Sequence, residues 1–253
     1  MLHLKVLACK ALFRELSMFA TYSPNVIDFT WLPWGLHDLV GELVVALQEE
    51  IDAIDSGKDR HSSYPPYNRP FDAILLGYGL CSNGIAGLSS KTCPLVIPRA
   101  HDCITLFLGS KERYRELFDE NGGTYWYSAG WIENSELPGK REHAAMVERL
   151  SKKHDEESAE MMTSLYEEWQ TNYSRLAQIT WPEFAGKEFQ RDHCGISTDS
   201  AEELGWQFAE FEGDSTLLSD FIAGNWDDGR FLVVPPGKKV EPSYGDDIIT
   251  YTD

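Results

Sequence analysis

The stretch that decides the fold is residues 71–109, FDAILLGYGLCSNGIAGLSSKTCPLVIPRAHDCITLFLG. It contains two short apolar runs, residues 73–76 ending at Gly77 and residues 94–97 ending at Pro98. Apolar runs of this length, bounded by glycine and proline, are typical of buried parallel strands. If the two strands are parallel, the loops that follow them leave the same edge of the sheet. Open α/β sheets bind their ligands at that edge.

Both loops carry residues that can bind a metal ion or move a proton. The first loop, residues 77–84, reads GYGLCSNG, and the second, residues 99–103, reads RAHDC. Thiolates and imidazoles are preferred protein ligands of zinc and of iron–sulfur clusters. The simpler alternative is that each cysteine only packs in the core, as free cysteines often do. We expect this structural role for Cys93, which precedes the second run at the opposite edge.

A third cysteine reaches the same edge if residues 2–8 form another parallel strand, because Cys9 follows that segment. Cys9, Cys81 and Cys103 would then supply three thiolates and leave one position open, as in a [4Fe–4S] cluster with an accessible iron or in a zinc site. His101 and His193 are competing ligands. On a helix, His101 and Cys103 would diverge by about 200°, so both reach one metal ion only if this turn is irregular.

Other polar residues are candidates for catalysis and substrate binding. Arg99 would pair with an anionic group of the substrate, or alternatively with Asp102. His37 or Asp102 would move protons. The expected substrate-binding residues of the glycine-rich loop are Tyr78, Gly79 and Asn83. This loop fits neither the dinucleotide fingerprint nor the Walker pattern, because its third glycine is misplaced and no Lys-Ser/Thr pair follows.

Strand and helix patterns alternate through residues 1–130. Strands are expected at 2–8, 26–32 and 124–127 besides the two central runs, and helices at 36–54 and 106–118. This alternation predicts an α/β fold, a Rossmann-like and mostly parallel sheet flanked by helices.

Residues 131–253 are expected to form a more helical second half that returns a strand, residues 231–234, to a sheet. Within it we expect helix over 142–178, a loop at 190–195 and a further helix over 201–211. The tail from Gly237 is expected to be exposed and poorly ordered.

Composition limits the classes of function. The chain has 253 residues and a formal net charge of −19, which disfavours binding to nucleic acid or to an anionic membrane. No apolar run approaches the roughly 18 residues of a membrane-spanning helix. Five scattered cysteines argue against a disulfide framework and favour a reducing cytoplasm. We therefore expect a cytoplasmic protein that acts on a small molecule.

Several long phrases resemble a known family. GLHDLVGELVVALQEEID, FDAILLGYGLCSNGIAGL, PLVIPRAHDCITLFLGSKERYRELF and GTYWYSAGW together closely resemble the DUF1638 family of uncharacterised bacterial and archaeal proteins. The resemblance covers residues 5–132 and the late phrase DFIAGNWDDGRFLVVPPG. It implies a setting of corrinoid-dependent methyl transfer, with a corrinoid protein or a methyltransferase as partner, and it implies no mechanism.

Three hypotheses follow. The first is a metal-dependent enzyme with a Cys/His centre of zinc or iron–sulfur type, acting on a small polar or anionic substrate in one-carbon or methyl-group metabolism. The second is a corrinoid-binding or methyltransferase accessory protein without turnover, with His37 or His101 as an axial cobalt ligand. The familiar corrinoid signature D-x-H-x-x-G is absent from the sequence, and its absence counts against this hypothesis. The third is a metal-free enzyme with Cys81 as nucleophile, activated by His101.

Overall fold

The computed structural model describes residues 1–36, 39–59 and 69–252. The chain forms two compact units: a first unit of Met1–Tyr114 with Asp214–Asp253, and a second unit of Arg115–Gly213. The observed division therefore differs from the expected one at residue 130. The reason is that β5 (Thr124–Tyr127) pairs with β6 (Arg175–Thr180) in a separate sheet.

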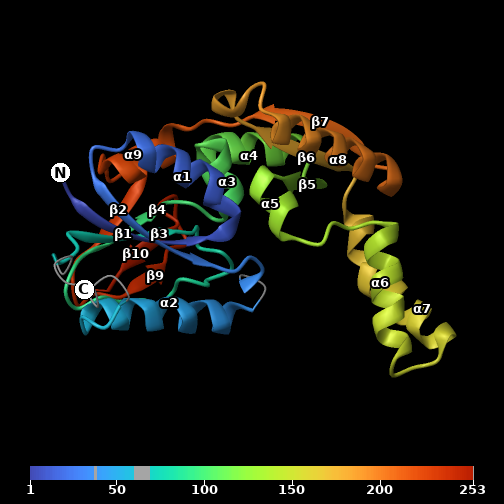
Figure 1. Ribbon diagram of the computed structural model, residues 1–253, viewed down its shortest axis with the longest axis horizontal. Helices are drawn as coiled ribbons and strands as arrows, with labels where there is room; N and C mark the ends of the chain where they lie inside the picture. The colour runs from blue at the N-terminus through green and yellow to red at the C-terminus, as the bar shows by residue number, and fades with distance from the viewer. Residues whose placement is uncertain (37–38, 60–68, 253) are drawn as a thin grey trace. The chain divides into compact units, whose positions relative to one another are not determined.

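A five-stranded sheet forms the centre of the first unit (Figure 1). Its strands are β1 (His3–Cys9), β2 (Val26–Leu32), β3 (Ala73–Gly77), β4 (Leu95–Pro98) and β8 (Phe231–Val234). The order is β2-β1-β3-β4-β8, and only β8 is antiparallel to its neighbour. The predicted mostly parallel α/β sheet is confirmed, and its strand order reverses direction between β1 and β3.

Helices cover both faces of this sheet. Figure 1 shows α2 (Val40–Asp55) on one face, and α1 (Phe13–Tyr22) with α9 (Thr216–Ala223) on the other. The expected apolar stripe of α2 is present, since Leu43, Leu47 and Ile51 are fully buried. Each such side chain contributes about 1.5–3 kcal/mol when buried, so this face alone anchors the helix to the sheet.

The prediction of a single helix over 106–118 is wrong, because two helices cover this stretch. They are α3 (Cys103–Leu108) and α4 (Lys111–Glu120). Gly109 separates them with a φ of 83°, a left-handed conformation that ends a helix at little cost for glycine. Its amide donates to the carbonyl of Thr105 at 2.9 Å, which closes α3.

The expectation of a poorly ordered tail is also wrong. The tail forms an antiparallel pair, β9 (Val240–Pro242) and β10 (Ile249–Tyr251). Val240, Ile248 and Ile249 are at most 2% exposed and join the core on the α2 face of the sheet. Val240 is isolated among polar residues, and Ile248 and Ile249 are an adjacent pair, so no alternating strand pattern marks the tail; burial of these three residues orders it.

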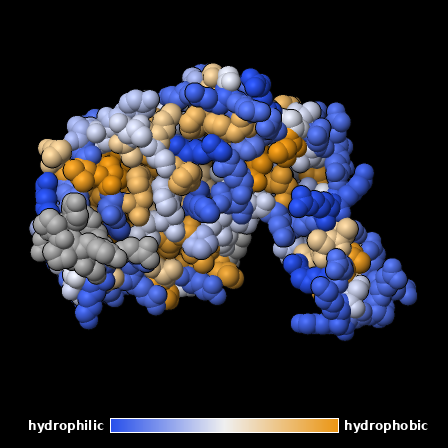
Figure 2. Space-filling view, viewed as in Figure 1, coloured by the Kyte–Doolittle hydropathy of each residue, from blue (hydrophilic) through white to orange (hydrophobic). Residues whose placement is uncertain are grey.

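The second unit contains a smaller parallel sheet, ordered β5-β6-β7, with β7 at Gln207–Glu212. Its helices are α5 (Ala129–Asn134), α6 (Lys140–Ser151), α7 (Glu156–Tyr166) and α8 (Glu188–Leu204). Short 3₁₀ turns cover Glu167–Asn172 and Pro182–Phe184 in this unit, and another, Lys10–Leu12, follows β1 in the first unit. Hydrophilic side chains cover most of the visible face of α6 and α7 (Figure 2).

Three expectations for the second half are wrong. Helix does not extend through residue 178, because β6 begins at Arg175. The expected loop at 190–195 lies inside α8, and the expected helix over 201–211 ends early because β7 follows. The inward face of α8 is formed by His193, Ser197 and Ala201, which are too small or too polar to give an apolar helical stripe.

Candidate functional site

The candidate site lies in the first unit, at the carboxyl edge of the large sheet where the strand order reverses. Cys9 is the last residue of β1, and Cys103 is the first residue of α3, just after β4. The loop after β3 is hydrogen-bonded to the loop after β4, through Leu80 N to Ala100 O and Cys81 N to His101 O, both 2.8 Å. Reversal points of this kind are the usual ligand-binding crevices of open α/β sheets.

The loop after β3 has an unusual backbone. Cys81, Ser82 and Asn83 are consecutive and have φ values of 45°, 56° and 70°. A left-handed conformation costs roughly 1–2 kcal/mol for most non-glycine residues and less for asparagine. Residues held in such conformations cluster at ligand-binding and catalytic sites. The sequence pattern predicted a glycine-rich loop here and did not predict this strained run.

Three thiols meet at this edge. The pKa of Cys81 is raised to about 12 by burial and by negative charge on Asp102 and Cys9, although a backbone contact at Gly79 lowers it. The pKa of Cys103 is raised by burial and by charge on Asp102, Cys81 and Cys9. Burial likewise raises the pKa of Cys9, which is 8% exposed. Charge on Cys9 acts on Cys81 and on Cys103, and charge on Cys81 acts on Cys103, so the three thiols lie within electrostatic range of one another.

These thiols are neutral at physiological pH unless a cation joins them. Within the described residues, no group of three or more His, Cys, Asp and Glu side chains is arranged to hold a metal ion. The three thiols therefore do not form a metal-binding group as they stand in the described residues.

Tyr78 lies beside the thiols and is 4% exposed. Burial raises the pKa of its hydroxyl, and charge on Cys9 and Cys81 raises it further. The hydroxyl oxygen is buried and has no hydrogen-bond partner among the described residues. A buried polar group without a partner costs about 1–3 kcal/mol, so this hydroxyl is suited to donate a hydrogen bond to a bound ligand.

Asp102 begins α3, since its Oδ1 accepts from the amides of Ile104 at 3.0 Å and Thr105 at 3.2 Å. Burial raises the pKa of its carboxyl group, although these hydrogen bonds, Tyr114 and the nearby His101 lower it. Helix capping is a structural role that the sequence did not reveal for this residue. The exposed His101 lies before the helix begins, where the backbone is extended.

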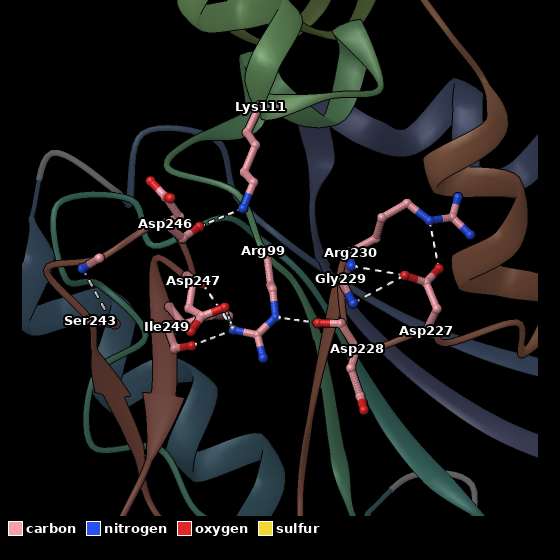
Figure 3. A network of polar contacts seen from close by, with 11 residues as sticks. Arg99, Lys111, Asp227, Asp228, Gly229, Arg230, Ser243, Asp246, Asp247 and Ile249 are labelled. Atoms are coloured by element: carbon pink, nitrogen blue, oxygen red, sulfur yellow. Dashed lines mark hydrogen bonds and ion pairs between the residues drawn. The ribbon is translucent and has the colours of Figure 1, made fainter.

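The main role of Arg99 is to hydrogen-bond the backbone carbonyls of two neighbouring segments. Its Nε donates to Asp228 O at 2.8 Å, and its Nη1 donates to Asp247 O at 2.9 Å and to Ile249 O at 2.6 Å (Figure 3). Its ion-pair partner is Asp247, at 3.8 Å, rather than the alternative partner Asp102. The side chain is 11% exposed, so it ties the β9–β10 segment to the end of β4.

The remaining candidates lie elsewhere. His193 is in α8 of the second unit, with Nε2 3.4 Å from Glu133 Oε1. His37 falls outside the described residues. Cys93 is buried, with Sγ 4.0 Å from the hydroxyl of Ser90.

The second unit has a cleft of about 500 Å³ that the sequence did not indicate. Glu136, Glu142 and Glu203 line it together with Lys140 and Arg141. Burial raises the pKa of Glu142, and the negative charge of Glu136 adds to the effect. The side chains that line this cleft carry both positive and negative charge. None of the catalytic, substrate-binding or metal-binding residues predicted from the sequence is among them.

Comparison with known proteins gives one match. Residues 31–222 match a family described as "Protein of unknown function (DUF1638)". No curated protein and no solved structure matches the chain. The matched residues include the two loops that carry Cys81 and Cys103, whereas Cys9 lies before them. Separately, none of the helices in the described residues is long and apolar enough to cross a membrane.

Proposed function

The chain belongs to the DUF1638 family, whose function is unknown, and from this premise we propose that it is a metal-dependent enzyme with a centre built from Cys9, Cys81 and Cys103. The centre would hold zinc or a [4Fe–4S] cluster and act on a small polar or anionic substrate. The observation that supports this proposal is the convergence of three thiols at the edge where such sheets bind ligands.

The raised pKa values of the three thiols are consistent with a site that is completed by a bound cation. Burial and mutual charge repulsion hold them protonated, and a bound metal ion would reverse this by stabilising the thiolates and releasing their protons. Three thiolates leave one coordination position for the substrate. There the ion would act as a Lewis acid, while the buried hydroxyl of Tyr78 would donate a hydrogen bond to the bound substrate.

The fourth ligand we propose is the substrate or His101. His101 and Cys103 would diverge by about 200° if both lay on a helix. In the structure α3 begins at Cys103, and the preceding Asp102 is extended, with φ −153° and ψ −178°. This non-helical turn before α3 supports the proposal that His101 and Cys103 share one ion. His193 lies in α8 of the second unit, and the centre that we propose is built from residues of the first unit.

The metal-free alternative is weaker on the same grounds. Burial and nearby negative charge raise the pKa of Cys81 to about 12, so its thiol stays protonated at neutral pH, and the thiolate is the nucleophilic form. Among the described residues, no cationic side chain is one of the groups that shift the pKa of Cys81. An unassisted Cys81 is therefore a poor nucleophile.

The reaction class we propose is one-carbon or methyl-group metabolism, in which thiolate-bound zinc activates a thiol or a methyl donor. Its support is the family resemblance together with the thiol centre, and a corrinoid protein or a methyltransferase is the corresponding partner. A non-catalytic corrinoid-binding role is the alternative within the same setting.

The test is metal analysis with an absorption spectrum, on protein purified without oxygen or chelator. Iron with sulfide and a brown colour would identify a cluster, and about one zinc per chain without colour would identify a zinc centre. A corrinoid spectrum would favour the accessory role. Protein that contains no metal and binds none on addition would contradict the proposal.

A further inference from the structure

One edge of the large sheet is formed by β2, a strand of seven residues with the sequence VIDFTWL. The strand at the other edge, β8, has only four residues. Proteins usually keep a sheet edge from pairing with another chain by making it short or by placing proline, lysine or a bulge in it. β2 contains no proline or lysine, and its register with β1 is unbroken over all seven residues. It therefore lacks these protections.

The backbone groups on the outer side of β2 belong to Ile27, Phe29 and Trp31. The amide of Val26 donates to the carbonyl of Leu2 on the β1 side, at 2.9 Å. Because successive residues of a strand direct their backbone groups to opposite sides, residues 27, 29 and 31 direct theirs away from β1. Within the part of the chain that the structure describes, β2 pairs with β1 alone. These amides and carbonyls are therefore available to a further strand.

The side chains along this edge are apolar and partly exposed. Ile27, Phe29 and Trp31 are half-buried on the face of the sheet that α1 covers. The rings of Phe29 and Trp31 are stacked, with their centroids 4.7 Å apart, and the ring of Phe13 in α1 meets Trp31 edge-on at 5.3 Å. Phe13 is itself 46% exposed. An apolar strip thus runs beside the outer backbone groups, which is typical of a surface that another chain covers.

The charge of the edge differs from that of the whole chain. The formal net charge of −19 opposes the approach of two copies over most of their surface. The one charged residue of β2 is Asp28, and it forms an ion pair with Lys5 of β1. Two copies that meet at β2 therefore bring together apolar side chains and a carboxylate that is already neutralised.

We infer that β2 pairs with β2 of a second copy of this chain, in an antiparallel register centred on Phe29. This register places Phe29 opposite itself and Ile27 opposite Trp31, and such aromatic and β-branched pairs are favourable across strands. Asp28 then faces Thr30, whereas a register centred on Asp28 would oppose two carboxylates.

The same register also matches the backbone. The residues whose groups face outwards lie opposite one another, so that each of these pairs exchanges both of its N–H···O hydrogen bonds. The two sheets become one continuous sheet, and the unprotected edge is closed. This inference does not depend on the proposed metal centre.

The first experiment measures the mass of the full-length protein in solution by light scattering, over a range of protein concentrations. We expect a dimer, at twice the chain mass of 28.7 kDa. Phe29→Lys should weaken the dimer about a hundredfold or more, because it places two lysines opposite each other at the twofold axis. The matched control is Val45→Lys in α2, where the side chain is 56% exposed and lies away from the edge. It should leave the dimer unchanged, and circular dichroism checks that both variants are folded.

Cysteine crosslinking tests the register without adding charge. Phe29→Cys should form a disulfide-linked dimer on mild oxidation, because a hydrogen-bonded antiparallel pair has its Cα atoms about 5.5 Å apart, within disulfide range. Ile27→Cys, on the same face of the same strand, should not, because Trp31 of the other copy lies opposite it. The wild type gives the background from the native cysteines.

Three results would overturn the inference. The first is a wild type that is monomeric at every concentration, which would leave the β2 edge to a strand from a different protein. The second is a dimer that Phe29→Lys leaves intact, because the copies would then meet at another surface. The third is equal crosslinking of Phe29→Cys and Ile27→Cys, which would exclude the register.

Discussion

Gly79 lies so close to Asp102 that a Cβ atom built on the glycine would stand 2.7 Å from the Asp102 amide nitrogen. No real side chain tolerates that distance to backbone, so glycine at this position allows the loops after β3 and β4 to touch. The candidate site therefore depends on a backbone contact between its two loops.

Gly79→Ala should separate these loops. We expect a loss of about 1–3 kcal/mol in the free energy of unfolding, as for other overpacked sites, measured by urea denaturation. The matched control is Gly41→Ala in α2, where an added Cβ meets nothing within 4 Å. That change should be neutral or should stabilise by up to about 1 kcal/mol. Equal effects of the two substitutions would refute the role of the contact.

Ser82→Gly should relieve strain in the left-handed run. Serine is held at a φ of 56°, and glycine adopts this region freely, so we expect a gain of up to about 1 kcal/mol. Asn83→Gly, at a φ of 70°, should gain less because asparagine tolerates this conformation better. Thermal or urea unfolding of the two variants provides the comparison. A larger gain for Asn83→Gly than for Ser82→Gly would show that strain does not set the order.

Arg99→Met should loosen the β9–β10 segment. The substitution removes three hydrogen bonds from a largely buried guanidinium to backbone carbonyls, and we expect a loss of about 2–4 kcal/mol. Limited proteolysis should then cut within residues 240–252. Arg69→Met is the control, because Arg69 is 51% exposed and pairs with the exposed Asp72. Its ion pair is worth less than about 1 kcal/mol. The account fails if Arg99→Met leaves the tail as resistant to protease as in the wild type.

His143 should titrate above its ordinary pKa of about 6.5. Its Nδ1 is 2.8 Å from Glu167 and its Nε2 is 2.9 Å from Glu160, and hydrogen bonds to these carboxylates raise its pKa, with Glu167 the larger cause. The stabilisation is therefore fully present below the unfolded pKa and is lost as the pH rises through the folded one. In NMR titrations, Glu167→Gln should lower the pKa of His143 more than Glu160→Gln does, and the opposite order would contradict the assignment.

The periodicity of the sequence predicted much of the first unit. Apolar runs bounded by glycine and proline gave β3 and β4, and the four-residue spacing of Leu43, Leu47 and Ile51 gave α2. The sheet to which β5 belongs could not be read from the chain, because a strand pattern does not name its partner. In β7, the last four residues, AEFE, alternate apolar and charged side chains. That is a strand signal, which the reading of residues 201–211 as helix overlooked.

The candidate site was predictable only in part. Cysteines at strand ends can be placed at one edge once the strands are taken as parallel. The left-handed run, the unpartnered hydroxyl of Tyr78 and the cap formed by Asp102 depend on contacts between loops, which no local pattern encodes.

The most direct test of the central claim is the metal content of four cysteine variants against that of the wild type, all purified without oxygen. Cys9→Ser, Cys81→Ser and Cys103→Ser each remove one thiol of the proposed centre. Cys93→Ser removes a buried thiol that packs beside Ser90, and it serves as the control. Circular dichroism of each variant checks that the chain remains folded.

The account predicts bound metal in the wild type and in Cys93→Ser, at equal stoichiometry. It predicts a marked loss of metal from folded Cys9→Ser, Cys81→Ser and Cys103→Ser. Unchanged metal content in those three variants, or a wild type that holds and takes up no metal, would contradict it.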